Sequence, residues 1–270
     1  MLSCTINVKN EAAIIDHWML HHANMFDALY VLDYASTDDT VDRILTHRPD
    51  AHIVEPKFIW GPAVEDIQLI ESTIDGWKIA LNVTEFVVNS DLRHFCKELD
   101  RTDWTGIRSS GFVLIDDPET EFHAGKSIIE QCTRGYAEHD WLFDTASETD
   151  AYTVTLRSNM LLGLDGRSRL MHKNMQGCYG QGRHRTSLTT IWPRPTGTCP
   201  ESEFVIAWAG WAPADIRKQR RMLHANRQLD GLACTDAEVW RSLAKQSYDL
   251  RRSTLYNRIW SERRYSSNRI

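Results

Sequence analysis

Residues 9–40, KNEAAIIDHWMLHHANMFDALYVLDYASTDDT, decide the fold of this chain. Apolar side chains recur between Ile14 and His22 at steps of three and four residues, a spacing that predicts one buried face of a helix. Short apolar runs at 2–8 and 28–32 lie on either side of it and are typical of buried strands. The segment therefore predicts a strand, a helix and a second strand, with the two strands parallel.

Polar side chains follow each of these strands at the point where it ends. Asn10 and Glu11 come after the first strand, and Asp33 ends the second, before a turn at 36–38. Ligands of open parallel sheets bind outside the carboxyl ends of the strands, so we expect these residues and Ser36 to share one rim. A plain turn followed by a helix cap is the simpler interpretation of residues 33–40, because Ser, Thr and Asp are common in both.

Strand and helix patterns go on alternating after this segment. The sequence predicts helices at 39–47 and 63–81 and strands at 51–55 and 84–89. Further strands are expected at 106–115 and 204–208, where the alternation has become irregular. This order predicts an α/β fold with a mostly parallel, doubly wound sheet, helices on both faces and a decorated C-terminal half. We expect one domain over 1–230 and a C-terminal helical extension with a basic tail over 231–270.

The composition argues against several classes of protein. The chain has 270 residues, 42% of them hydrophobic and 25% charged, which is typical of a folded globular protein. A net charge of −6 argues against a dedicated nucleic-acid-binding protein, so no specific nucleic-acid partner is expected. No apolar run approaches the roughly twenty residues that span a bilayer. Six scattered cysteines, together with a start that lacks a signal-peptide pattern, predict reduced thiols in a cytoplasmic protein.

The last stretch of the chain is strongly basic. Residues 251–270 carry six arginines against one glutamate. Such a tail is either an exposed helix with a frayed end or a peripheral contact to an anionic membrane surface or a nucleic acid. The sequence leaves both interpretations open.

The spacing within residues 10–40 resembles the opening of GT-A-fold glycosyltransferases of the family 2 type, in the branch that reads NE…W…HH… and then DxxSTD. The residues that match are Asn10, Glu11, Trp18, His21, His22, Asp33, Ser36, Thr37, Asp38 and Thr40. The resemblance implies a GT-A-like domain that moves a sugar from a nucleotide-sugar donor to a glycan or lipid-linked acceptor. It also implies that Asp33 holds the nucleotide base, with Asn10, Glu11 and Ser36 around the nucleoside.

The resemblance further implies a divalent cation, Mn²⁺ or Mg²⁺, held by a DxDEF element at the end of the fourth strand. The ion would neutralise the charge of the departing nucleoside diphosphate. With that strand expected at 84–89, the stretch 89–95 reads NSDLRHF, which puts Asp91 at the first acidic position and Arg93 at the second.

Three interpretations of this element stay open. In the first, Asp91 holds the ion together with a histidine from elsewhere in the chain. In the second, the Arg93 guanidinium meets the phosphates in place of the ion, with two parallel hydrogen bonds. In the third, the site is degenerate, and the protein binds nucleotide sugars or glycans without transferring them.

A basic stretch at 167–185, RSRLMHKNMQGCYGQGRHR, lies where the family carries a histidine that reaches the metal or the diphosphate. The resemblance implies this role for His184, as a metal ligand or a phosphate contact, whereas a basic surface loop is the simpler interpretation. An inverting transfer also needs a carboxylate that takes the proton of the acceptor hydroxyl. Asp140 is the candidate base, with Asp144 and Glu119 as alternatives.

Overall fold

The fold is described from a computed structural model of the chain. The residues that it describes are 1–57, 64–89, 91–102, 105–114, 122–132, 134–137, 169–173, 191–192, 204–209 and 248–249. The helices are α1 (Ile15–His22), α2 (Thr40–His47), α3 (Val64–Ser72), α4 (Leu92–Leu99) and α5 (Ile128–Gln131). The strands are β1 (Leu2–Val8), β2 (Ala28–Asp33), β3 (His52–Val54), β4 (Trp77–Asn82), β5 (Glu85–Val88), β6 (Gly106–Arg108), β7 (Ser110–Leu114), β8 (Arg134–Ala137), β9 (Leu170–Lys173), β10 (Ile191–Trp192), β11 (Val205–Trp208) and β12 (Tyr248–Asp249).

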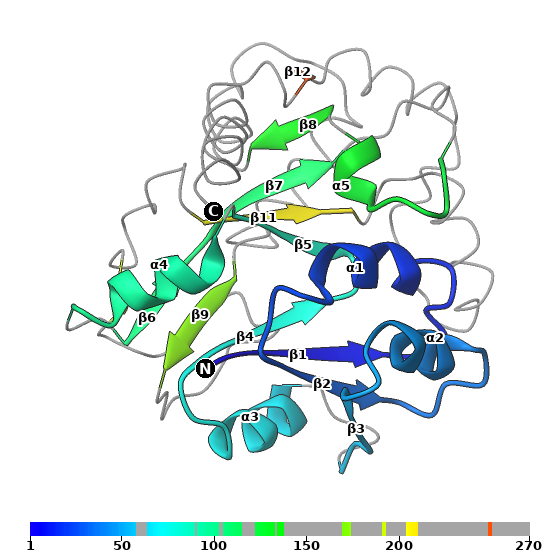
Figure 1. Cartoon of the computed structure of the whole chain (residues 1–270), viewed down its shortest axis with the longest axis horizontal. Coiled ribbons are helices and arrows are strands. Elements are labelled where there is room, and N and C mark those ends of the chain that lie inside the picture. Colours follow the sequence, from blue (N-terminus) through cyan, green and yellow to red (C-terminus); the bar gives the residue numbers. More distant parts are fainter. Residues whose placement is uncertain are drawn as a thin grey trace, which may run out of the picture.

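Seven of the described strands form one sheet, here called the large sheet, in the order β10-β6-β9-β4-β1-β2-β3. Its strands β4, β1 and β2 lie side by side in Figure 1. β1 pairs in parallel with β2 on one side and with β4 on the other, and β2 pairs in parallel with β3. β9 runs antiparallel between β4 and β6. The large sheet is therefore mainly parallel, and the predicted α/β fold is confirmed.

The remaining described strands form a second, small sheet in the order β12-β8-β7-β11-β5. Its pairings are antiparallel except for β11 with β7. β5 is an edge strand of the small sheet and follows β4 of the large sheet after a two-residue turn. The chain thus passes from one sheet to the other directly after β4.

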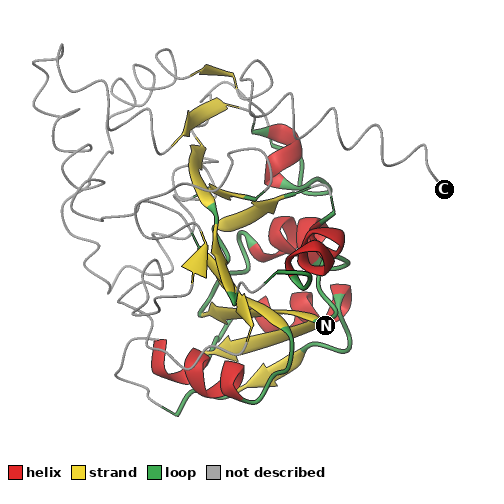
Figure 2. Cartoon of the chain, turned by 90° about the vertical axis from the view of Figure 1, so that its left-hand side faces the viewer, coloured by secondary structure: helices red, strands yellow, loops and turns green. Residues whose placement is uncertain are grey.

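Helices cover both faces of the large sheet, as expected (Figure 2). Alternate residues of a strand point to opposite faces. Ile79 and Leu81 of β4 belong to the main core cluster, which also contains Trp18 of α1. Ala80, between them, belongs to a second cluster with Ile67 of α3. The two clusters are therefore the two sides of one sheet.

The helix predicted over 63–81 is wrong in its second half. α3 ends at Ser72, and the chain then turns at Gly76, whose φ of +85° favours glycine, before β4 begins. Trp77 and Leu81 fit both patterns, because residues four apart share a face in a helix and also in a strand. The missed strand is the parallel neighbour of β1. The strand expected at 84–89 is β5, which belongs to the small sheet.

Two other predicted segments have different outcomes. The strand expected at 106–115 is divided at Ser109 into β6, in the large sheet, and β7, in the small sheet. The strand expected at 204–208 is confirmed as β11. The proposed extension over 231–270 lies outside the described residues except for β12, and the domain boundary stays a prediction. Within the described part of the chain, no helix is long and apolar enough to cross a membrane.

Candidate functional site at the carboxyl edge of the large sheet

The candidate site lies where β1, β2 and β4 end, which we call the carboxyl edge of the large sheet. The register pairs Val8 with Asp33, and it pairs Asn82 with the residue before Val8, so the three strands end level with one another. The opposite end, where these strands begin, is the amino edge. Ligands of open parallel sheets bind at the carboxyl edge.

Asn10, Asp33 and Ser36 converge at this edge, as the sequence predicts. The Ser36 hydroxyl donates to Asp33 Oδ1 over 2.6 Å and accepts from the backbone N–H of Asn10 over 3.0 Å. The side-chain oxygen of Asn10 accepts from the Thr37 N–H over 2.7 Å. Asn10 and Ala35 have φ angles of 53° and 55°. These left-handed conformations are uncommon for residues other than glycine and are typical of tight turns and functional sites.

Glu11, Asp38 and Thr40 join the same two loops a little further along the chain. The Thr40 hydroxyl oxygen accepts from the Glu11 N–H over 2.7 Å and donates to Asp38 Oδ1 over 2.5 Å. Asp38 Oδ2 accepts from the Ala12 N–H over 3.1 Å. The Glu11 residue is only 7% exposed. Residues 33–40 therefore form the predicted turn, and hydrogen bonds from this turn also hold the loop after β1 in place.

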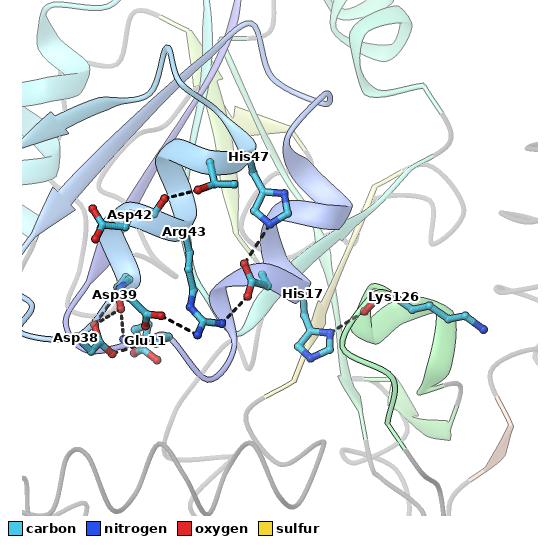
Figure 3. A network of polar contacts seen from close by, with 12 residues as sticks. Glu11, His17, Asp38, Asp39, Asp42, Arg43, His47 and Lys126 are labelled. Carbon is cyan, nitrogen blue, oxygen red and sulfur yellow. Dashed lines mark hydrogen bonds and ion pairs between the residues drawn. The ribbon is translucent and has the colours of Figure 1, made fainter.

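An ion network fixes α1 to α2 next to these loops (Figure 3). Asp16 of α1 pairs with Arg43 over 2.6 Å and with His47 over 3.0 Å, and Arg43 also reaches Asp39 over 2.8 Å. Hydrogen bonds to Asp39 and then to Asp16 raise the pKa of the Arg43 guanidinium, so it stays charged. Since Asp39 directly precedes α2, the network holds the start of this helix against α1.

Side chains of α1 show in which direction β5 runs. Trp18 Nε1 donates to the Glu85 carbonyl over 3.0 Å, and one turn later His22 Nε2 accepts from the Val87 N–H over 3.1 Å. His21 Nε2 lies 2.7 Å from the Val87 carbonyl oxygen. α1 runs from the carboxyl edge, after β1, to the amino edge, before β2. β5 therefore runs from the carboxyl edge towards the amino edge.

Asp91 and Arg93, which follow β5, lie at the amino edge. Arg93 Nε pairs with Asp27 Oδ1 over 3.0 Å, and the other oxygen of Asp27 accepts from the N–H of Leu2, the first residue of β1. Asp91 caps α4 by accepting from the His94 N–H over 2.9 Å. The six-residue strand β2, which ends at Asp33, spans about 20 Å from the amino edge to the carboxyl edge. The expected convergence of Asp91 and Arg93 with Asp33 is therefore wrong.

The end of β4 takes the place that we expected for residues 89–95. β4 is the fourth parallel strand, and the residues at its end read Asn82-Val83-Thr84-Glu85-Phe86. Compared with DxDEF, the last two letters are kept, while an amide and a hydroxyl stand at the two acidic positions. The signal was present in the sequence, because Trp77, Ile79 and Leu81 alternate with polar or small residues, as in a strand.

Both carboxylate oxygens of Glu85 accept hydrogen bonds in this turn. Its carboxylate accepts from the Asn82 N–H over 2.7 Å and from Arg169 Nε over 2.7 Å, and its other oxygen accepts from the second nitrogen of the same guanidinium. Both side chains are buried, at 0% and 1% exposure. Arg169 directly precedes β9, which runs antiparallel to β4, so the ion pair lies at the carboxyl edge.

These residues do not fit a divalent cation that β4 would hold. Amide and hydroxyl oxygens ligate such ions, but the double charge is normally balanced by carboxylates. The carboxylate at this point, Glu85, is neutralised by Arg169. Within the described ranges, no group of three His, Cys, Asp or Glu side chains is placed to hold a metal ion.

The basic stretch at 167–185 is described only at its start. Arg169 is paired with Glu85, His172 lies 3.0 Å from Glu71, and Lys173 lies 2.9 Å from Asp100. These three side chains are thus held by carboxylates of the protein itself. His184 and Asp140 lie outside the described residues, as do Glu119 and Asp144, and their expected roles stay predictions.

Comparison with known proteins gives matches among solved structures alone. No family model matches the chain, and no curated protein matches it. One matching structure is glucosyl-3-phosphoglycerate synthase from Mycobacterium tuberculosis in complex with Mn²⁺, UDP and glucosyl-3-phosphoglycerate, with a TM-score of 0.32 and 19% identity over 42% of this chain and 44% of that one. Another is S. aureus TarS in complex with UDP-GlcNAc, with a TM-score of 0.32 and 12% identity over 43% and 34%.

The chain therefore spans less than half the length of these two solved structures. A likeness at this level of identity and TM-score does not assign an activity to the chain.

Proposed function

We propose that this protein binds a nucleoside diphosphate sugar at the carboxyl edge of the large sheet and transfers the sugar to a glycan or lipid-linked acceptor. The observation that carries the proposal is the convergence of Asn10, Asp33 and Ser36 at the ends of two adjacent parallel strands. Their spacing is also the part of the sequence that resembles family 2 glycosyltransferases. The proposal joins this resemblance to the geometry of the rim.

The carboxyl edge around Asn10, Asp33 and Ser36 offers the hydrogen-bonding groups that a nucleoside needs. The Asp33 carboxylate is half-buried and held in one orientation by the N–H and the hydroxyl of Ser36. A carboxylate offers more lone pairs than these two donors use, and the bases uracil and guanine present N–H donors to it. Fixing the carboxylate in advance lowers the entropy cost of binding. Asp33 therefore serves as the base contact, with Asn10 and Ser36 shaping the loop around the nucleoside.

In the transfer itself, the acceptor hydroxyl oxygen attacks the anomeric carbon while the bond from that carbon to the diphosphate breaks. A carboxylate takes the hydroxyl proton, and the nucleoside diphosphate leaves with the bonding electrons. Asp140 is our candidate for the base and His184 for a diphosphate contact. Asp91 and Arg93 are left out of this assignment because they lie at the amino edge.

A second candidate function is a binding module that retains the nucleotide rim without transfer. The observation that favours it is the pair Asn82 and Thr84 at the two positions where the resemblance expects carboxylates. Binding of UDP-sugars or GDP-sugars without donor hydrolysis or transfer to any offered glycan would favour the module. Release of UDP or GDP from the donor would favour the transferase.

Calorimetric titration with UDP and GDP, and with their sugars, tests the rim. Replacing Asp33 by Ala removes a hydrogen bond to a charged group, worth roughly 1.5–3 kcal/mol, so the dissociation constant should rise about tenfold to a hundredfold. Asp50→Ala is the matched control, because Asp50 is exposed and lies at the amino edge, before β3. Equal affinity of the wild type and the Asp33 variant would remove Asp33 from the site. Failure of all these nucleotides to bind would refute the proposed function.

A further inference from the structure

We infer that this protein binds the diphosphate of its donor without a divalent cation held at the end of β4. The inference rests on the proposed function for the donor, but its structural premise concerns the residues of β4 alone. A strand in this position, parallel to the central strand and ending at the carboxyl edge, is where the resemblance implies a metal-binding pair of carboxylates. This chain has Asn82 and Thr84 there.

Among the described residues of this turn, the charges sum to zero. Asn82 and Thr84 are uncharged, and the Glu85 carboxylate is matched by the Arg169 guanidinium in a buried ion pair. A dication placed here would meet the fixed positive charge of Arg169, and the described residues of the turn offer no second carboxylate to offset it. Ion attraction and repulsion are strong at such a point because both side chains are removed from water.

The ion pair also holds the turn in its present shape. Glu85 accepts from the Asn82 N–H, and the Asn82 side-chain nitrogen lies 3.4 Å from the other Glu85 oxygen. The Thr84 carbonyl accepts from the Ala209 N–H, which ties the turn to β11. The Glu85 carboxylate thus positions the backbone between β4 and β5.

Binding of Mn²⁺ to the protein alone, followed by electron paramagnetic resonance, tests this without any nucleotide. The wild-type protein and Asn82→Ala should leave the same signal of free Mn²⁺, because the wild type holds no ion at the end of β4. The double variant Asn82→Asp/Thr84→Asp introduces the two carboxylates that the resemblance expects. It should bind Mn²⁺ at least about tenfold more tightly than the wild type. Asn82→Asp alone serves if the double variant does not fold. Asn89→Asp makes the same change near the amino edge and should have no effect.

A second measurement compares the affinity for UDP and GDP in Mn²⁺ and in chelator, where the wild type should show the same dissociation constant in both. Two results would overturn the inference. In the first, chelator weakens nucleotide binding about tenfold or more, and Asn82→Ala abolishes this dependence. In the second, the wild type binds Mn²⁺ and Asn82→Ala does not. Mn²⁺ binding that Asn82→Ala leaves intact places the ion elsewhere and supports the inference. Absence of nucleotide binding under all conditions refutes the proposed function instead, while the Mn²⁺ measurement still decides the metal question.

Discussion

Lowering the pH should destabilise this protein through His22. This imidazole is buried between α1 and β5, where Nε2 accepts from the Val87 N–H and Nδ1 lies 3.1 Å from the Trp18 carbonyl oxygen. The nitrogen that accepts carries no proton, so the other one donates and the ring is neutral. Burial, together with the neighbouring His21, lowers the pKa of His22 well below 6.5.

The magnitude follows from the difference between the two states. In the unfolded chain His22 takes up a proton below about pH 6.5, whereas in the folded protein it stays neutral. The unfolded state then binds more protons, so the free energy of unfolding falls as the pH is lowered. The stability is fully present above the unfolded pKa and is lost as the pH drops below it. Between about pH 7.5 and about pH 5.5 the loss is about 1 kcal/mol.

Urea unfolding of the wild type and of His22→Gln at several pH values checks this. Glutamine keeps an acceptor for the Val87 N–H but does not titrate, so the variant should be less stable at neutral pH and should lose about 1 kcal/mol less on acidification. His52→Gln, at an exposed histidine, is the control and should lose as much as the wild type. The carboxylates of Asp27 and Asp100, whose pKa values lie below 3.8, act only at lower pH. An equal loss in the wild type and the His22 variant would refute the assignment.

Two further predictions concern the fold around the site. Arg169→Met leaves the buried Glu85 carboxylate without its partner and should cost about 3–5 kcal/mol in the free energy of unfolding, whereas adding Glu85→Leu should recover part of this loss; a double variant no more stable than Arg169→Met would contradict the pairing. Gly76→Ala should destabilise the protein by at least about 1 kcal/mol, because φ is +85° and the new Cβ would lie 2.5 Å from the Met1 carbonyl oxygen. Gly125→Ala, where nothing lies within 4 Å, is the control for thermal and urea unfolding, and equal effects at both glycines would argue against the backbone explanation.

The rim of the candidate site was predictable from the sequence because its determinants are local. β1, α1 and β2 follow one another within about thirty residues, and each has a single clear period. Asn10 and Asp33 stand at the ends of the two strands, so the parallel pairing alone brings them to one edge. The contacts between them, through Ser36 and Thr37, are hydrogen bonds between loops that the strand ends have already placed side by side.

The other half of the site was decided by the tertiary structure. Trp77 and Leu81 are four residues apart, a spacing that a helix and a strand share, so the pattern did not distinguish β4 from the end of a helix. Pairing with β1 settles the matter, because a parallel neighbour satisfies the backbone groups of both strands. The same pairing moves the fourth strand end from Asp91 to Asn82. Once the chain leaves β4 for the small sheet, β5 carries Asp91 to the opposite edge, which no local pattern in the sequence records.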